Sequence, residues 1–405
     1  MAHTHPITIA LSGLGGYGEQ YLNELLDPRY EGRVTPAGGI DPQPERCTRL
    51  ADLQARGAPI YQTLADFYQE HSADLLIVSA PIHEHAPQTC LGLAHGSHVL
   101  CEKPLAATVQ EADAMIAARD KVGTTVAIGY QWSFDPVILS LKRDIMAGHF
   151  GRPLRLSTVA LWPRTAAYYA RNNWAGRQKA PSGAWVLDSP ANNAVAHYLH
   201  NMLFLLGARI DRSVTPLNVQ AELYRANPIE NYDTAALRVA VEGGAEILFY
   251  ASHAVSESFG PVLRAEFENG TIHMDGLSGR LTARTRAGAQ IDYGVPDNGV
   301  RAKLEASLNA IERGAPVTCG IEAARAHTVC INGAQESAEE IADFDPAQIS
   351  HMDAQDGRLT FVAGLGEALR QCAEAGKLPS EMGFAWARPG RMIDLRGYAI
   401  FPSGK

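Results

Sequence analysis

The stretch ITIALSGLGGYGEQ (residues 7–20) decides how the N-terminal part of the chain folds. Its first half is a short apolar run typical of a buried β-strand, and a helix-like segment follows at 16–26. Between them lie Gly13, Gly15 and Gly18, a spacing that favours a phosphate-binding turn when a strand precedes it and a helix follows. Gly13 permits the tight turn, Gly15 lets a pyrophosphate approach the backbone, and Gly18 lets helix and strand pack closely.

The first 130 residues alternate between strand-like and helix-like segments. Further strands are predicted at 35–41, 73–81, 98–104 and 124–130, and helices at 44–57 and 108–123. This alternation predicts βαβ units and a doubly wound parallel sheet, the Rossmann fold that binds dinucleotides. Gly16 and Tyr17 lie inside the glycine turn, so they are also expected to contact the cofactor.

Asp41 ends the second predicted strand, 23 residues beyond Gly18. A carboxylate at this place is expected to bond the adenosine ribose hydroxyls and to repel a 2′-phosphate. No arginine stands directly beside Asp41, and Arg46 is the nearest one beyond it. The sequence therefore favours NAD over NADP as the cofactor.

The rest of the chain has a different pattern. Strand-like runs lie at 152–163, 215–224, 233–242, 245–255, 262–274 and 278–293, and helices are predicted at 189–207, 300–313, 320–342 and 357–376. Strands joined by short glycine-containing turns predict a large, mostly antiparallel sheet in an α+β domain. We therefore expect a nucleotide-binding domain at 1–130 and a second domain, for substrate binding and oligomerisation, at 131–405.

Composition excludes several classes of function. The chain has 405 residues and a net charge of -9 without a block of lysine and arginine, which argues against a nucleic-acid partner. It has no apolar run long enough to span a membrane, and its N-terminus does not resemble a signal peptide. Its six cysteines form no CxxC pair, so neither a disulfide framework nor a cysteine zinc site is predicted. We expect a cytoplasmic protein.

The most specific stretch is CEKP (101–104), at the carboxyl end of a predicted strand, where open parallel sheets bind ligands. Six features follow one another along the chain. They are the glycine turn, the acidic residue after the second strand, SAPIHEH (79–85), CEKP, GYQWSFDP (129–136) and the large sheet. In this order the chain resembles the glucose–fructose oxidoreductase/inositol dehydrogenase (Gfo/Idh/MocA) family, over residues 6 to about 340. The final 60 or so residues extend past the resemblance, and either complete the sheet or reach a neighbouring subunit.

The resemblance implies roles for several residues. Lys103 is implied to lie beside the nicotinamide and the substrate hydroxyl, and thus to be catalytic. Glu102, Pro81 and His85 are implied to lie near the cofactor, although His85 is also compatible with a purely structural bond at a helix start. The family's sheet domain implies a homodimer or homotetramer.

The family also carries an Asp-x-x-x-His signature on a helix, and here the chain departs from it. His197 takes the histidine position, but Asn193 stands where the acid is usual. On a helix, Asn193, His197 and His200 share a stripe about 60° wide. A neutral imidazole suits a general base near pH 7, so His197 is predicted to accept the hydroxyl proton while Lys103 bonds the same oxygen. Asn193 cannot be a base but can orient a hydroxyl.

The alternatives on this helix stay open. His197 is also compatible with the polar side of a core helix, and His200 with either a substrate contact or a packing residue. The pair His197-x-x-His200 invites a metal interpretation, but no third ligand stands at a suitable spacing, so no metal is predicted.

Residues 162–185 are dense in aromatic and basic side chains. We expect Trp162, Arg164 and Tyr168 to bind a sugar, because flat rings and hydrogen-bonding cations suit its apolar faces and hydroxyl rim. A loop buried in a subunit contact is the alternative. Trp132 stands where the family often carries arginine and is included among the expected substrate contacts.

The prediction is an NAD-dependent dehydrogenase that oxidises a secondary alcohol of a sugar, glycoside or cyclitol. The resemblance implies this substrate class. One alternative is an enzyme that retains its NAD and uses transient oxidation for glycoside cleavage or epimerisation. Another is a non-catalytic NAD-binding sensor, which Asn193 favours and which Lys103 and His197 oppose.

Overall fold

The computed structural model describes residues 5–403, and these form two compact units. The N-terminal unit runs to Asp135 and also contains Asp297–Arg325, whereas the sheet unit contains Pro136–Pro296 and continues from Ala326. The grouping differs from a single division at residue 130, because the segment 297–325 returns to the N-terminal unit through helix α9 (Arg301–Arg313). That helix packs against a strand of the first sheet.

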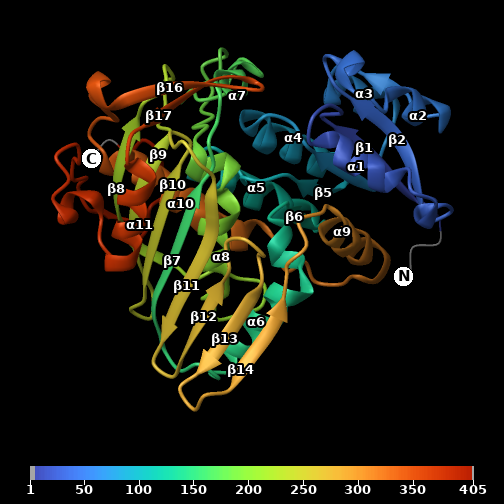
Figure 1. The fold of residues 1–405 in the computed structure, drawn as a ribbon. Helices are drawn as coiled ribbons and strands as arrows, with labels where there is room; N and C mark the ends of the chain where they lie inside the picture. The colour runs from blue at the N-terminus through green and yellow to red at the C-terminus, as the bar shows by residue number, and fades with distance from the viewer. Residues whose placement is uncertain (1–4, 404–405) are drawn as a thin grey trace. The chain divides into compact units, whose positions relative to one another are not determined.

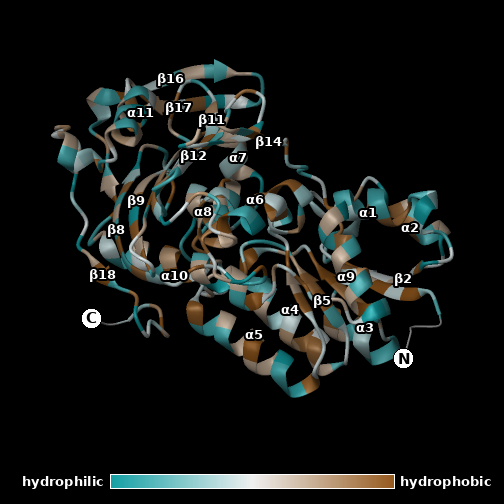
Figure 2. Ribbon diagram, turned by 90° about the horizontal axis from the view of Figure 1, so that it is seen from below, coloured by the Kyte–Doolittle hydropathy of each residue, from teal (hydrophilic) through white to brown (hydrophobic). Residues whose placement is uncertain are grey.

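The N-terminal unit is built on a six-stranded parallel sheet in the order β3-β2-β1-β4-β5-β6 (Figure 1). Its strands are β1 (Ile7–Ser12), β2 (Val34–Ile40), β3 (Ile60–Tyr61), β4 (Leu75–Val78), β5 (His98–Cys101) and β6 (Val126–Ile128). All four residues of β4 are buried, as expected for a central strand of a parallel sheet with helices on its faces. The strands around β5 are hydrophobic and appear brown in Figure 2.

Helices surround this sheet. They are α1 (Gly18–Leu25), α2 (Leu50–Ala55), α3 (Leu64–Glu70), α4 (Ile82–Ala94), α5 (Val109–Val122) and α9. Helix α5 begins at a capping box in which Glu111 accepts a hydrogen bond from the backbone N–H of Thr108 (2.8 Å), and it confirms the helix predicted at 108–123. The helix predicted over 44–57 is wrong in its first half, because the backbone N–H of Thr48 donates to Glu19 of α1 (2.7 Å) instead of continuing a helix.

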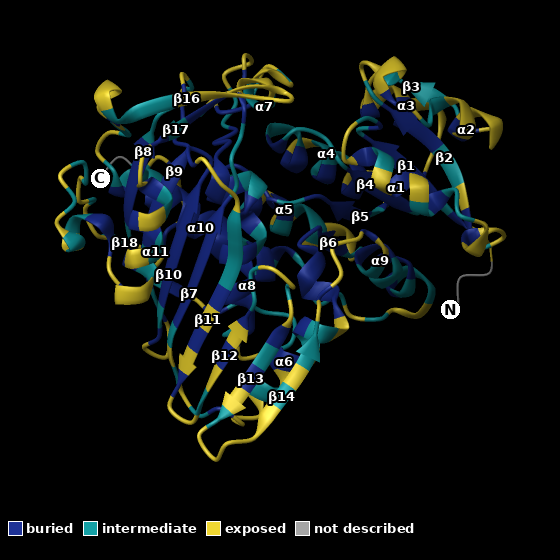
Figure 3. Ribbon diagram, in the orientation of Figure 1, coloured by how far each residue is buried: buried dark blue, intermediate teal, exposed yellow. Residues whose placement is uncertain are grey.

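The sheet unit is built on a ten-stranded sheet in the order β14-β13-β12-β11-β7-β10-β9-β8-β15, with β18 also paired to β8 (Figure 1). The strands are β7 (Pro153–Leu161), β8 (Pro216–Arg225), β9 (Thr234–Val241), β10 (Glu246–Ser252), β11 (Phe259–Phe267), β12 (Gly270–Met274), β13 (Leu281–Thr285), β14 (Gln290–Gly294), β15 (Ala342–Asp343) and β18 (Ile393–Asp394). Among these described strands only the pairs β7–β10 and β8–β15 are parallel, so the predicted fold class is confirmed. Figure 3 shows buried central strands and a more exposed edge at β13 and β14.

The helices of the sheet unit are α6 (Pro136–Met146), α7 (Ala166–Ala170), α8 (Ala196–Leu205) and α11 (Leu365–Ala375), and α10 (Ile321–Ser337) contains the boundary between the units. The single helix predicted over 189–207 is wrong, because a π-helical turn, Pro190–Ala194, precedes α8 and the backbone breaks at Val195. The helix predicted over 357–376 is wrong at its start, because β17 (Gly357–Val362) pairs with β16 (Ile349–Ala354).

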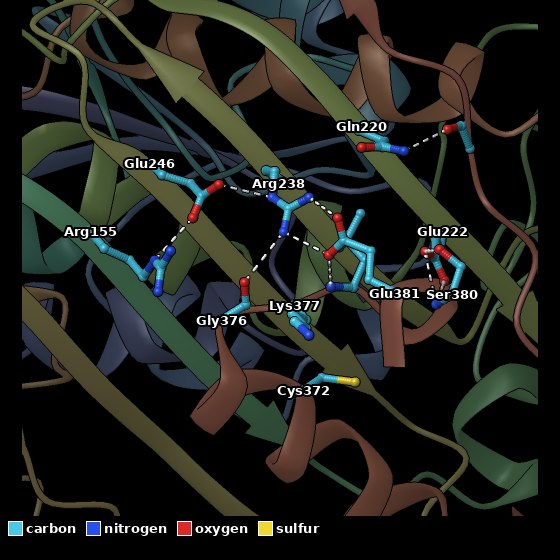
Figure 4. Close-up of polar contacts among 12 residues, drawn as sticks. Arg155, Gln220, Glu222, Arg238, Glu246, Cys372, Gly376, Lys377, Ser380 and Glu381 are labelled. Carbon is cyan, nitrogen blue, oxygen red and sulfur yellow. Dashed lines mark hydrogen bonds and ion pairs between the residues drawn. The ribbon is translucent and has the colours of Figure 1, made fainter. Parts of the chain in front are cut away.

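The C-terminal residues pack on the large sheet. Helix α11 and the turn Pro379–Met382 belong to an apolar core that includes Leu248 and Tyr250 of β10. Polar contacts surround this core: Arg238 of β9 forms ion pairs with Glu381 (2.6 Å) and Glu246 (2.9 Å) (Figure 4). Since β18 pairs with β8, the end of the chain adds to its own sheet. No helix in the described range is long and apolar enough to cross a membrane.

Candidate cofactor and active-site residues

The glycine turn after β1 is closed on its inner side and open on its outer side. Gly13 has φ 87°, and a Cβ atom placed on it would lie 2.3 Å from the carbonyl oxygen of Ser79. A Cβ on Gly18 would lie 1.9 Å from the carbonyl oxygen of Gly13. Around Gly16 (φ 59°) such an atom meets nothing within 4 Å, and at Gly15 its nearest neighbour is 3.9 Å away. The turn therefore leaves room for a pyrophosphate on its outer side, and the residues present fit a dinucleotide.

Asp41 follows β2 and is bonded to this turn. Its Oδ2 accepts from the backbone N–H groups of Leu14 (2.9 Å) and Gly15 (3.4 Å), and its Oδ1 accepts from Gln43 (2.8 Å). Each carboxylate oxygen has two acceptor sites, so Asp41 retains capacity for a ribose hydroxyl while it shapes the loop.

Arg46 lies closer to this turn than the sequence suggests. Its Cβ is the atom 3.9 Å from a Cβ placed on Gly15. Sequence reasoning separated Arg46 from Asp41 by counting residues, and missed that the 3₁₀ turn Pro44–Arg46 brings it back beside the glycines. Because an arginine can accommodate the 2′-phosphate of NADP, turnover should be measured with both NAD and NADP.

Two other predicted cofactor residues lie at the start of α4. Pro81 is the N-cap of this helix, and His85 is buried in its first turn. The ring of His85 bridges two backbone segments: Nδ1 lies 2.7 Å from the carbonyl oxygen of Pro104, and Nε2 lies 3.0 Å from that of Ala80. Burial lowers the pKa of His85, although both carbonyl groups oppose this change. These contacts join α4 to the loop that carries Lys103.

Lys103 comes two residues after the end of β5, at the carboxyl edge of the parallel sheet, and is partly exposed. Glu102, the residue before it, is buried, and its side chain is 7% exposed. Glu102 accepts a hydrogen bond from the hydroxyl of Tyr21 on α1 (2.6 Å) and forms an ion pair with Lys303 on α9. Burial raises the pKa of Glu102, but the charge of Lys303 and these bonds outweigh burial, and the net pKa lies below its usual value.

Sequence reasoning missed Lys303. The signal was its position in the apolar stripe of the predicted helix at 300–313, next to Leu304 and one turn before Ser307, both of which are buried. Tyr17, by contrast, is 41% exposed at the glycine turn, and its ring packs edge-on against Tyr21. Trp132 is buried, and its Nε1 donates to Asn298 (2.8 Å) within the same unit.

In the sheet unit, Asn193 lies in the π-helical turn and is bonded to an acid. Its Nδ2 donates to Oδ1 of the buried Asp188 (2.7 Å), whose Oδ2 accepts from the backbone N–H of Gly176 (2.6 Å). A carboxylate five residues earlier in the chain thus lies directly beside Asn193. Sequence reasoning missed Asp188, whose only local signal is its place just before Ser189-Pro190, where the turn begins.

His197 and His200 differ in burial. His197 is the one partly exposed residue among the ten that form α8. His200 is 1% exposed and stacks on Phe204 with ring centroids 5.8 Å apart. Burial, together with the nearby charges of His327 and Lys142, lowers the pKa of His200 well below its usual value. Of these two histidines, His197 is therefore the more exposed one.

The aromatic segment folds into a cluster of rings and guanidinium groups. The Cζ atoms of Arg164 and Arg171 lie 5.0 and 3.7 Å from the ring centroid of Tyr168. Trp162 packs edge-on against Tyr198 of α8, and its carbonyl oxygen lies 2.8 Å from Nδ1 of His253. The structure therefore brings Trp162, Arg164 and Tyr168 together within the sheet unit. Within residues 5–403, no group of three or more acidic, histidine or cysteine side chains is placed to hold a metal ion.

Comparison with curated proteins gives distant relatives. Inositol 2-dehydrogenase 4 of Saccharopolyspora erythraea is 26% identical over 279 residues, which are 68% of this chain and 75% of that protein. An inositol 2-dehydrogenase of Burkholderia multivorans is 26% identical over 202 residues, 50% of this chain and 55% of that protein.

Solved structures share the fold at low identity. The WlbA dehydrogenase of Bordetella pertussis, in complex with NADH and UDP-GlcNAcA, matches with a TM-score of 0.68 at 19% identity and covers 82% of this chain and 98% of its own. The UDP-N-acetylglucosamine 3-dehydrogenase GnnA of Acidithiobacillus ferrooxidans matches with a TM-score of 0.63 at 21% identity, with 82% and 97% covered. A family model described as an oxidoreductase family with an NAD-binding Rossmann fold matches residues 7–130. The resemblance inferred from the sequence is thus confirmed over residues 7–130, which match the NAD-binding Rossmann domain of the Gfo/Idh/MocA oxidoreductase family.

Proposed function

We propose that the protein is an NAD-dependent dehydrogenase that oxidises a secondary alcohol of a sugar, glycoside or cyclitol. One observation carries the proposal: Lys103 stands at the carboxyl edge of the parallel sheet in an NAD-binding Rossmann domain, the edge at which the glycine turn also lies. Ligands of open parallel sheets bind at this edge. The substrate class is supported by relatives named inositol 2-dehydrogenase and by a fold shared with a UDP-N-acetylglucosamine 3-dehydrogenase.

Each residue has a proposed role. NAD, when bound, supplies the nicotinamide ring that accepts the hydride. The glycine turn and Asp41 hold the dinucleotide, Lys103 donates a hydrogen bond to the reacting oxygen, and His197 takes the hydroxyl proton on a neutral imidazole. Asn193, oriented by Asp188, positions a neighbouring hydroxyl. Trp162, Arg164 and Tyr168 offer ring faces and hydrogen-bond donors to the sugar.

The first experiment follows absorbance of NADH while purified protein and NAD are mixed with sugars, glycosides and inositols, and it is repeated with NADP. Accumulation of NADH with one class supports the dehydrogenase and identifies its substrate. Tightly bound nucleotide without accumulation supports the enzyme that retains its NAD. The absence of both turnover and bound nucleotide contradicts both readings. Faster turnover with NADP than with NAD contradicts the predicted preference for NAD.

A substitution tests the general base. His197→Ala is expected to lower kcat by about 10³-fold, the usual loss for a general base, with the Kd of NAD nearly unchanged. His149→Ala, an exposed histidine of the same unit, serves as the control and is expected to leave kcat unchanged. Turnover of His197→Ala close to that of the wild type would remove His197 from the mechanism.

A further inference from the structure

Lys303 is a buried charge that the proposed function does not use. It lies on α9 within the N-terminal unit, and its side chain is 0% exposed. Lysine is almost never fully buried unless it is paired. Its Nζ forms an ion pair with Glu102, donates to the carbonyl oxygen of Gly129 (3.2 Å), and lies 3.4 Å from the hydroxyl of Tyr17.

The partner of Lys303 is the residue directly before Lys103. Glu102 is bonded from three sides: by Lys303, by the hydroxyl of Tyr21 on α1, and by the backbone N–H of Lys103 itself (3.1 Å). A Cβ atom on Gly129 would lie 2.8 Å from both carboxylate oxygens, so the glycine at this position makes room for the carboxylate. The space is therefore shaped around the carboxylate of Glu102 and its partners.

The two lysines share one carboxylate. Glu102 interacts electrostatically with Lys103 as well as with Lys303, and charges attract strongly where burial excludes water. Without the charge of Lys303, the buried carboxylate of Glu102 would still attract the charge of Lys103, the next residue in the chain. The ammonium of Lys103 would then be drawn toward Glu102 and away from a substrate oxygen.

We propose that Lys303 is a positioning residue for Lys103: it neutralises Glu102 and so keeps this carboxylate from capturing the ammonium that bonds the substrate hydroxyl. The inference rests on the proposed function, in which Lys103 is catalytic. It also assigns the returning segment 297–325 a part in the reaction, since α9 supplies the counter-charge.

The same helix offers a matched control. Arg301 of α9 also forms an ion pair with a carboxylate of α1, Glu24 (3.0 Å), but at the surface and away from Glu102. If Lys303 only fastened α9 to the unit, Arg301 and Lys303 would share one role. Arg301→Met therefore reports the effect of losing a fastening, and Lys303→Met reports that effect together with the loss of the counter-charge.

The experiment compares K303M, E102Q, the double variant E102Q/K303M and R301M in the full chain. It measures kcat and KM with the substrate found above, the Kd of NAD by fluorescence titration, and the midpoint of thermal unfolding. K303M is expected to lower kcat about 100-fold with the Kd of NAD changed by less than about threefold, and R301M to leave both unchanged. The double variant is expected to recover kcat to within about fivefold of the wild type, because the neutral amide that E102Q introduces does not attract Lys103.

The double variant also decides the case if K303M fails to fold, since it contains no unpaired buried charge. A double variant as slow as K303M, or slower, overturns the proposal, and so does wild-type kcat in K303M. Failure of the proposed role of Lys103 is recognised separately, because Lys103→Met would then retain full turnover, and failure of the proposed function itself is recognised by the absence of turnover in the wild type. A loss of unfolding midpoint without a loss of kcat in K303M assigns Lys303 a structural role and overturns the inference.

Discussion

The two units hold their candidate functional residues in different ways. In the N-terminal unit most of these residues lie in short stretches that directly follow a parallel strand, such as the glycine turn at 13–18 and the loop at 102–104. In the sheet unit they are scattered over residues 162–200 and meet through contacts such as the bond of Asn193 to Asp188 and the packing of Trp162 on Tyr198. A site built from one loop is visible as a motif, whereas a site built from several elements is visible only in the fold.

The difference has a physical origin. A parallel sheet aligns the carboxyl ends of its strands, so any residue directly after a strand reaches the same edge. The strands of the sheet unit run in both directions, so their carboxyl ends do not meet at one edge. The positions of its loops depend on side-chain contacts instead. In this unit the protonation and orientation of each side chain depend on partners that are distant in sequence.

The substitution with the largest expected effect tests whether Lys103, in the loop after β5, is catalytic. Lys103→Met is expected to lower kcat by 10³- to 10⁴-fold, roughly the contribution of a catalytic proton-transfer group, with little change in the Kd of NAD. Steady-state kinetics and a binding titration measure the two effects. A variant that loses NAD affinity in proportion to kcat would make Lys103 a cofactor ligand instead.

The second prediction compares alanine substitutions at two glycines of the turn after β1, the local motif of the N-terminal unit. Gly13→Ala brings a Cβ to 2.3 Å from the carbonyl oxygen of Ser79, so it is expected to cost about 3 kcal/mol of unfolding free energy and about 100-fold in NAD affinity. Gly16→Ala also has a positive φ but meets nothing within 4 Å, and is expected to cost about 1 kcal/mol. Denaturant unfolding and NAD titration check both. Equal costs would show that backbone strain, not the contact with Ser79, constrains the turn.

Much of the N-terminal unit follows from its sequence because the determining interactions are local. The glycine spacing, the apolar run of β4 and the helical pattern at 108–123 each act within a few residues, and the structure confirms the turn, the strand and the helix. The buried pairing of Glu102 with Lys303 spans 201 residues and has no such local mark. Only the place of Lys303 on an apolar helix stripe pointed to it.

The sheet unit was predictable in class but not in detail. Its strand pattern predicted a mostly antiparallel sheet, and the structure confirms this. Helical periodicity placed Asn193 and His200 on one stripe with His197. The π-helical turn before α8 changes the phase of Asn193 relative to the two histidines, and His200 is buried. The roles of Lys103, His197 and Asn193 remain predictions until they are tested.

The third prediction concerns a buried histidine of the aromatic cluster. Burial, with the charge of Arg164, lowers the pKa of His253 to about 3, below its unfolded value of about 6.5. On acidification the unfolded chain therefore takes up the proton first, and stability falls as pH drops from about 6.5 toward 3. His253→Asn retains a hydrogen-bond donor for the carbonyl group of Trp162. Between pH 7.5 and 4.5 its free energy of unfolding is expected to fall by about 2 kcal/mol less than that of the wild type. Urea unfolding at both pH values measures this, and parallel losses in the two proteins would contradict the assignment.

The smallest expected effect concerns the C-terminal segment, which is held to the sheet by a partly exposed network (Figure 4). Arg238→Met removes the ion pairs with Glu381 and Glu246 and is expected to lower the free energy of unfolding by about 1 kcal/mol, because pairs of this exposure contribute little. Turnover is expected to stay unchanged, since the apolar core around Tyr250 still holds α11 in place. Arg396→Met, which breaks a more exposed pair with Asp394, is the control and should alter neither quantity. A loss of turnover in Arg238→Met would mean that the sheet unit transmits changes at its C-terminal segment to the aromatic cluster, and that its scattered residues act as one site.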